Sequence, residues 1–199
     1  MKKIILTVVL SALFIAPVFA SEAGDMEILG KIGYTLDTDV KIYTESKDDY
    51  GSTDKGIVLG ADFCFYINSQ VAMGFGANNI FESKADYGMS DKYAFTNIYL
   101  SIRPKMDLDS DILDSFYFIA QAGYGFFRLD YDKNGIDEHF STDNGPYWAV
   151  GVGVEIMYSF FLELMHSFNY GSVTVDGDRY DMKYSALLIN VGYKFKFKP

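Results

Sequence analysis

The chain alternates between apolar and polar residues over most of its length. A period of two places successive side chains on opposite faces of a β-strand, so each alternating stretch predicts one strand. The pattern recurs eight times after residue 25, with polar turn residues between the stretches. The predicted strands are residues 26–44, 56–67, 71–82, 93–103, 115–130, 147–158, 160–170 and 182–197.

The two faces of these strands differ in character. In residues 56–67, Leu59 lies on an apolar face, whereas Asp62 and Cys64 lie on the opposite one. Residues 93–103 hold apolar side chains on both faces, and we assign the even-numbered positions to the apolar face. That choice places the odd-numbered aromatic residues of this strand, such as Tyr99, on the polar side.

In the first predicted strand the alternation continues to its end. Val40 and Ile42 continue the apolar face, and Asp37 and Asp39 continue the polar one. We therefore expect Val40 and Ile42 to point in the same direction as the apolar residues at the start of the strand.

The connections between the strands alternate in length. Long polar segments, rich in Asp, Ser, Gly and Asn, lie at residues 45–55, 83–92, 131–146 and 171–181, and shorter turns lie at 68–70 and 159. The segment at 104–114 is longer and acidic. Long loops at one end and mostly short turns at the other are typical of outer-membrane barrels. Both termini then lie at the short-turn end, which is periplasmic in such barrels.

The polar face carries features of a narrow barrel interior. Glycines gather there, and a glycine leaves room for a long side chain from a neighbouring strand. The face also carries three basic and three acidic side chains. Unpaired charges inside a barrel would be costly, so we expect these six to pair across the lumen. They are Lys31, Asp62, Arg103, Glu155, Glu163 and Lys194.

The apolar face then meets lipid, which is the reverse of a soluble barrel. We therefore predict an all-β fold, an eight-stranded antiparallel up-and-down transmembrane β-barrel. The alternative is a soluble, lipocalin-like ligand carrier, in which the same apolar face would line an internal cavity.

The N-terminus has the pattern of a secretory signal peptide. Lys2 and Lys3 precede an apolar run at residues 4–15, and small residues lead to Ala20. A transmembrane helix would need about 20 apolar residues, and Pro17 interrupts the run. We predict a signal peptide at residues 1–20 and one barrel domain at 21–199.

Composition excludes several classes of protein. Lys and Arg number 17 against 27 Asp and Glu, a net charge of -10, so no basic face is available for nucleic acid. Hydrophobic residues make up 49% of the chain, which excludes a disordered protein. The single cysteine, Cys64, permits no internal disulfide, and we expect it to be a small buried filler.

Three segments resemble a known family. They are residues 121–126 (QAGYGF), 150–155 (VGVGVE) and 190–195 (NVGYKF). Each is similar to a strand of the small outer-membrane barrels that include OmpX, the OmpA membrane domain and the opacity proteins. The resemblance implies an outer-membrane location with extracellular loops, recognition by the barrel-assembly machinery, contact with outer-membrane lipids and lipopolysaccharide, and a monomer.

The inventory of catalytic groups is small. The chain has two histidines, and His139 falls in a predicted loop. His166 and Ser167 invite comparison with lipid A deacylases, whose His and Ser stand two residues apart on one outward face. Here position 168 is Phe, and Ser167 points to the other face. We therefore expect no enzyme and no cofactor, and keep lipid A modification as an alternative.

One segment partly matches a calcium-binding loop. Asp130, Asp132 and Asn134 stand at alternate positions before Gly135, as in the first half of such a loop. The expected glutamate at the twelfth position is Ser141 instead. An Asn-Gly turn in an acidic loop is the commoner meaning of this pattern, so we assign no metal site.

These observations favour a structural and surface-interaction role. An eight-stranded lumen is filled by side chains, which disfavours a general diffusion porin. We expect the barrel to display its four long loops to host or cell-surface ligands, in adhesion or immune contact.

The signal-peptide prediction has a direct test. Export should cleave the chain after Ala20, because the small residues there fit the signal peptidase. N-terminal sequencing of protein extracted from the membrane should begin at Ser21, and a chain that retains Met1 would contradict the prediction.

Overall fold

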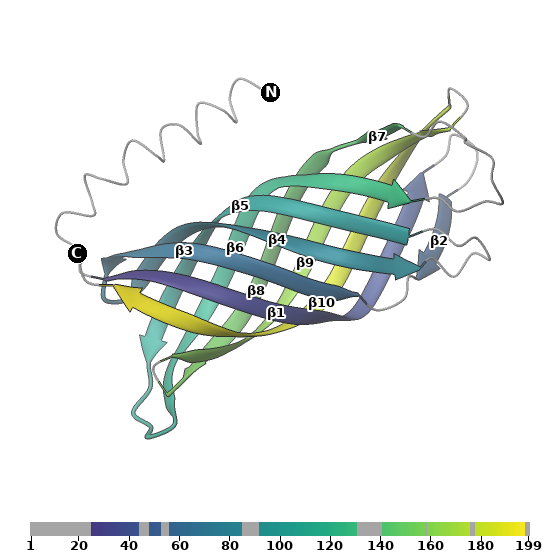
Figure 1. Ribbon diagram of the computed structural model, residues 1–199. Coiled ribbons are helices and arrows are strands. Elements are labelled where there is room, and N and C mark those ends of the chain that lie inside the picture. Colours follow the sequence, from purple (N-terminus) through teal and green to yellow (C-terminus); the bar gives the residue numbers. More distant parts are fainter. Residues whose placement is uncertain are drawn as a thin grey trace.

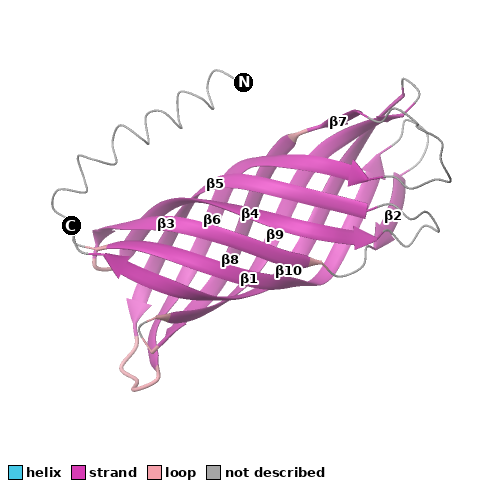
Figure 2. Ribbon diagram, in the orientation of Figure 1, coloured by secondary structure: helices cyan, strands magenta, loops and turns pink. Residues whose placement is uncertain are grey.

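The computed structural model describes residues 25–43, 48–52, 56–84, 92–130, 141–157, 159–175 and 178–197. Nearly all of them are β-strand, as the magenta ribbons of Figure 2 show. No helix within these ranges is long and apolar enough to cross a membrane. The strands are β1 (Met26–Tyr43), β2 (Asp48–Ser52), β3 (Ile57–Asn68), β4 (Val71–Lys84), β5 (Lys92–Asp107), β6 (Leu113–Asp130), β7 (Ser141–Asp143), β8 (Gly145–Ile156), β9 (Phe160–Val175) and β10 (Asp178–Phe197).

Eight of the strands close into a barrel (Figure 1). They pair antiparallel in the order β10-β1-β3-β4-β5-β6-β8-β9, and β9 pairs back to β10. Met26 at the start of β1 pairs with Phe197 at the end of β10, so both described ends of the chain lie together. We call this the turn end and the opposite one the loop end. The predicted eight-stranded antiparallel barrel is confirmed.

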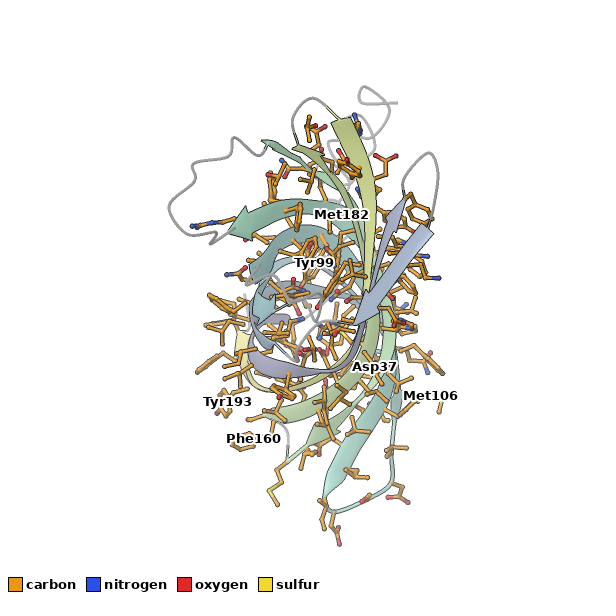
Figure 3. All side chains as sticks on the ribbon, turned by 90° about the vertical axis from the view of Figure 1, so that its right-hand side faces the viewer. Asp37, Tyr99, Met106, Phe160, Met182 and Tyr193 are labelled. Atoms are coloured by element: carbon orange, nitrogen blue, oxygen red, sulfur yellow. The ribbon has the colours of Figure 1, made fainter. Side chains whose placement is uncertain are left out.

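Apolar side chains point out of this barrel and charged ones point in. Phe118 is 53% exposed and Val150 is 48% exposed, whereas Lys31 is 6% exposed and Glu163 is fully buried. In the view along the barrel in Figure 3, Tyr193 and Phe160 lie outside the ring of strands. The apolar residues that a soluble carrier would enclose therefore face outward, which excludes the lipocalin-like alternative.

The phase expected for the end of β1 is wrong. Val40 is buried inside the barrel, and Asp37 and Asp39 are exposed. The cause is an irregularity at Leu36: the register moves from Thr35 opposite Leu188 to Asp37 opposite Leu187. One extra residue on one strand reverses which face each later side chain occupies. The side chain of Ile42 lies outside the described part.

The loop expected at residues 171–181 is also wrong. Most of it is strand, because β9 continues to Val175, which pairs with Asp178 at the start of β10. The short strand β7 adds to the edge of this hairpin, and Arg179 lies 3.5 Å from the carboxylate of Asp143 in β7. These cross-strand contacts extend the sheet through a segment whose polar composition suggested a loop.

The other long connections are described only in part. The segment at 45–55 contains β2, and the segment at 131–146 ends in β7 and the start of β8. Residues 1–24, with the predicted signal peptide, and residues 131–140, with Asp132, Asn134 and His139, lie outside the described residues.

Strand pairing divides at the loop end. Among the described residues, pairing of β1 with β3 ends at Tyr34 and Ile57, and pairing of β6 with β8 ends at Gly125 and Gly145. Beyond these points, β2, β1, β10, β9 and β7 form one group of paired strands, and β4, β5 and β6 form another. We call the first group beyond the ring the loop-end extension (Figure 1).

Close strand packing makes one glycine hard to replace. A Cβ at Gly123 would overlap the backbone oxygen of Ile98 and lie 2.6 Å from Cα of Tyr99, and backbone cannot move aside as a flexible side chain can. Gly123→Ala should lower the free energy of unfolding by about 1–3 kcal/mol.

The matched control is Gly30→Ala, because a Cβ at Gly30 would meet nothing within 4 Å. Its effect should stay within about 0.5 kcal/mol. Urea unfolding of the barrel in detergent micelles, followed by the fluorescence of Trp148, measures both variants. Equal stabilities for the two would contradict the packing argument.

Candidate functional site

Four charged side chains from four strands meet in the middle of the lumen. Nζ of Lys31 lies 2.7 Å from Oδ2 of Asp62 and 3.8 Å from Oε2 of Glu163. Nη2 of Arg103 lies 2.5 Å from the same oxygen of Asp62 and 3.3 Å from Oε1 of Glu163. All four side chains are at most 7% exposed. We call these residues the four-charge cluster, and its formal charges balance.

Two tyrosines complete the four-charge cluster. The hydroxyl of Tyr99 donates to Oδ1 of Asp62 at 2.6 Å, and that of Tyr117 donates to Oε1 of Glu163 at 3.3 Å. Nζ of Lys31 lies 5.5 Å from the ring centroid of Tyr99, within cation–π range. The ring of Tyr99 depends on a glycine of the neighbouring strand, because a Cβ at Gly76 would lie 2.8 Å from it.

A second group of charges lies nearer the turn end. Nζ of Lys194 is 2.7 Å from Oε1 of Glu155 and 3.5 Å from Oε1 of Glu27. Nζ of Lys105 is 2.9 Å from Oε2 of Glu155, and the hydroxyl of Tyr66 donates to Glu27 at 3.0 Å. We call these five residues the turn-end cluster. The structure therefore brings the six predicted lumen charges together in two groups, four in one and two in the other.

Sequence reasoning missed three members of the turn-end cluster. Glu27 and Tyr66 occupy the inward phase of their strands, so the alternation held the signal to find them. Lys105 falls in the segment at 104–114, which was predicted to be a connection. In the structure β5 runs on to Asp107, with Pro104 exposed and the amide of Lys105 donating to the carbonyl of Gln70.

A small cavity separates the two groups of charges. It measures about 10 Å³ and is lined by Glu27, Cys64, Tyr66, Ala72, Arg103, Lys105, Tyr117 and Glu155. A space of this size holds about one water molecule. Cys64 itself is buried and packs with Leu29, Ala72 and Phe161.

The lumen becomes apolar toward the loop end. A layer of amides comes first: Asn97 donates to Asn78 at 2.8 Å, and Tyr147 donates to Gln121 at 2.7 Å. Beyond it the ring of Phe95 lies 4.9 Å from that of Phe127 and 4.7 Å from that of Tyr184. Val40, Val173 and Met182 belong to the same buried cluster. Aliphatic and aromatic side chains thus fill this half of the lumen.

The remaining sequence candidates do not form a site among the described residues. His166 is exposed on the outer face and stacks on Phe168, with ring centroids 4.4 Å apart. Ser167 is buried on the inner face, where its hydroxyl donates to the carbonyl of Ala186 at 3.4 Å. Asp130 ends β6. Across the described ranges, no group of three or more His, Cys, Asp or Glu side chains is placed to hold a metal ion.

An apolar outer wall around a charged interior is typical of outer-membrane barrels, and a comparison with known families decides the family. The model of the outer membrane protein beta-barrel domain matches residues 6–195. The chain belongs to the outer membrane protein beta-barrel domain family. As a member of that family, it is an integral protein of a Gram-negative-type outer membrane, and the resemblance seen in the sequence is confirmed.

Solved structures of outer membrane proteins share the fold of this family member. OprG from Pseudomonas aeruginosa matches with a TM-score of 0.61 and 14% identity, over 89% of this chain and 97% of OprG. Neisserial surface protein A matches with a TM-score of 0.51 and 16% identity, over 85% of this chain and 97% of that protein. No curated protein sequence matches the chain.

The charge balance of the four-charge cluster can be tested by removing one charge. Asp62→Asn leaves two buried cations facing Glu163 alone, and it should lower the free energy of unfolding by about 3–5 kcal/mol. The double variant Lys31→Met, Asp62→Leu should recover much of this loss, because Arg103 and Glu163 remain balanced. Urea unfolding in micelles measures each variant.

The control is Asp109→Asn, which removes an exposed carboxylate at the turn end. It should change stability by no more than about 0.5 kcal/mol. A double variant less stable than Asp62→Asn would show that charge balance is not the controlling term.

Proposed function

We propose that the protein is a closed outer-membrane barrel that anchors a surface-interaction region at its loop end. The observation that carries this proposal is the filling of the lumen. The turn-end cluster, the four-charge cluster and the apolar residues around Phe95 occupy successive levels. The cavity between the two charged groups holds about one water molecule, too little for general diffusion of solutes.

The lengths of the strands support a role at the loop end. A tilted strand crosses a membrane in about 9–11 residues. β8 has 12 residues, but β1 has 18 and β10 has 20. On β1 the apolar outer face ends at Leu36, and on β10 it ends at Leu187, so the excess residues lie beyond the apolar band at the loop end.

The proposed orientation puts the loop end outside the cell and both termini in the periplasm. The loop-end extension is a sheet in its own right, and its strands carry the segments at 45–55, 131–146 and 171–181. A paired sheet that continues beyond the apolar band suits contact with ligands on host or neighbouring cells. Binding there, in adhesion or immune contact, is the function we propose.

Segment replacement tests this proposal. Each of the stretches 45–55, 83–92 and 131–140 is exchanged for a short Gly-Ser linker, and the matched control exchanges residues 108–112 at the turn end. At least one loop-end variant should lose adherence of expressing cells to epithelial cells or survival in serum, and the control should retain both. Heat-dependent electrophoretic mobility verifies that each barrel is folded.

Two results would count against the proposal. One is adherence, serum survival and envelope integrity that no loop-end replacement alters. The other is a sustained conductance of the wild-type protein in planar bilayers, because a filled lumen should carry no steady current.

A further inference from the structure

Two charged residues that line the small cavity each hold a buried atom with no hydrogen-bond partner among the described residues. One is Nε of Arg103, whose Nη2 contacts Asp62 and Glu163. The other is Oε1 of Glu27, whose Oε2 accepts a hydrogen bond from Tyr66. The side chains of Arg103 and Glu27 are 7% and 3% exposed, and both line the cavity. A buried polar group without a partner costs free energy, so both atoms need a further ligand.

The nearest cations do not supply this ligand to Glu27. Nζ of Lys194 lies 3.5 Å from Oε1 of Glu27, and Nζ of Lys196 lies 3.7 Å from it. Both distances suit an ion pair but exceed the usual length of a hydrogen bond. Nζ of Lys194 lies closer to Glu155, at 2.7 Å. Oε1 of Glu27 therefore keeps a free acceptor position beside the cavity.

Charge balance restricts what can bind between the two groups. The formal charges of the four-charge cluster cancel, and in the turn-end cluster Lys105 and Lys194 balance Glu27 and Glu155. Lys196, the further cation near Glu27, is 42% exposed, so water screens its charge. An ion placed between two balanced groups would add an unpaired buried charge, which is costly. The ligand of the cavity is therefore neutral.

Size and hydrogen bonding then identify the ligand. The cavity measures about 10 Å³, which is the space of about one water molecule. An arginine N–H only donates and a carboxylate only accepts, so the ligand has to accept one hydrogen bond and donate another. Tyr66 and Tyr117 also line the cavity, and because their protons go to Glu27 and Glu163, their oxygens remain able to accept. Water meets every one of these requirements, and a buried water makes about three hydrogen bonds.

We infer that the cavity binds one water molecule, which accepts a hydrogen bond from Nε of Arg103 and donates one to Oε1 of Glu27. We call it the bridging water. It joins the four-charge cluster to the turn-end cluster in one hydrogen-bonded network. Each group then depends on the other, because loss of the bridging water leaves a charged side chain short of a partner in both. This inference depends neither on the orientation nor on the function proposed above.

Nuclear magnetic resonance detects the bridging water directly in the full mature barrel in detergent micelles. A long-lived internal water gives cross-peaks of opposite sign in NOE and ROE spectra, whereas exchange of protons with bulk water gives the same sign in both. The Nε–H of Arg103 should show the opposite-sign pair at the water resonance. Ala72→Val enlarges a side chain that lines the cavity and should abolish that pair. The matched control is Ala77→Val on the outer face of the same strand β4, and it should keep the pair.

Stability separates a hydrated cavity from a dry one by the sign of the change. Filling a dry cavity stabilises a protein. Displacing the bridging water instead leaves Arg103 and Glu27 without a partner, so Ala72→Val should raise the equilibrium constant of unfolding by roughly tenfold. Ala77→Val should change it by no more than about twofold. Urea unfolding in micelles measures both variants.

Three results would overturn the inference. The first is a wild-type Arg103 Nε–H that shows no cross-peak to water, or only cross-peaks of the same sign. The second is an opposite-sign pair that persists in Ala72→Val, because the water would then lie elsewhere. The third is an Ala72→Val barrel as stable as wild type or more stable, which indicates a dry cavity. The wild-type spectra need no variant, so they decide the matter even where Ala72→Val does not fold.

Discussion

Charge balance inside the lumen is the constraint on which the rest of this barrel depends. Lys31, Asp62, Arg103 and Glu163 come from four different strands, and none can leave the interior without entering lipid. Because side chains alternate with a period of two, a slip of one residue in β1 would turn Lys31 outward and the apolar neighbours inward. The ion pairs inside and the apolar band outside therefore specify the same register. The ion pairs of the four-charge cluster thus fill the lumen and also fix the alignment of the strands in the wall.

The lumen also changes in character along its length. Charged pairs occupy the turn-end half, a layer of amides follows, and aromatic and aliphatic side chains fill the loop-end half. A buried ion pair resists separation because each charge would be left unpaired, whereas apolar packing yields more gradually. The loop-end half is also where strand pairing divides into two groups. The barrel is thus most tightly constrained at its middle and least constrained where the proposed contacts with ligands occur.

Most of the fold follows from alternation, and the failures have local causes. The odd-numbered aromatics of β5, such as Tyr99, do face the lumen, although that strand is apolar on both sides. The direction of Val40 was predicted wrongly, because the extra residue at Leu36 does not alter the polarity pattern of the residues before it. Lys105 was missed because β5 continues into the acidic segment at 104–114, which was predicted to be a connection. Which charges meet across the lumen depends on the stagger of eight strands, and a pattern within single strands does not contain that information.

The irregularity at Leu36 has a consequence for how the protein sits in its membrane. Without it, Val40 would face the acyl chains, and the outer face of β1 would stay apolar for several more residues. With it, two carboxylates emerge immediately past Leu36. Moving these carboxylates into the hydrocarbon is costly, so β1 resists deeper insertion into the membrane. A single inserted residue in β1 therefore limits how deeply the barrel inserts into the bilayer.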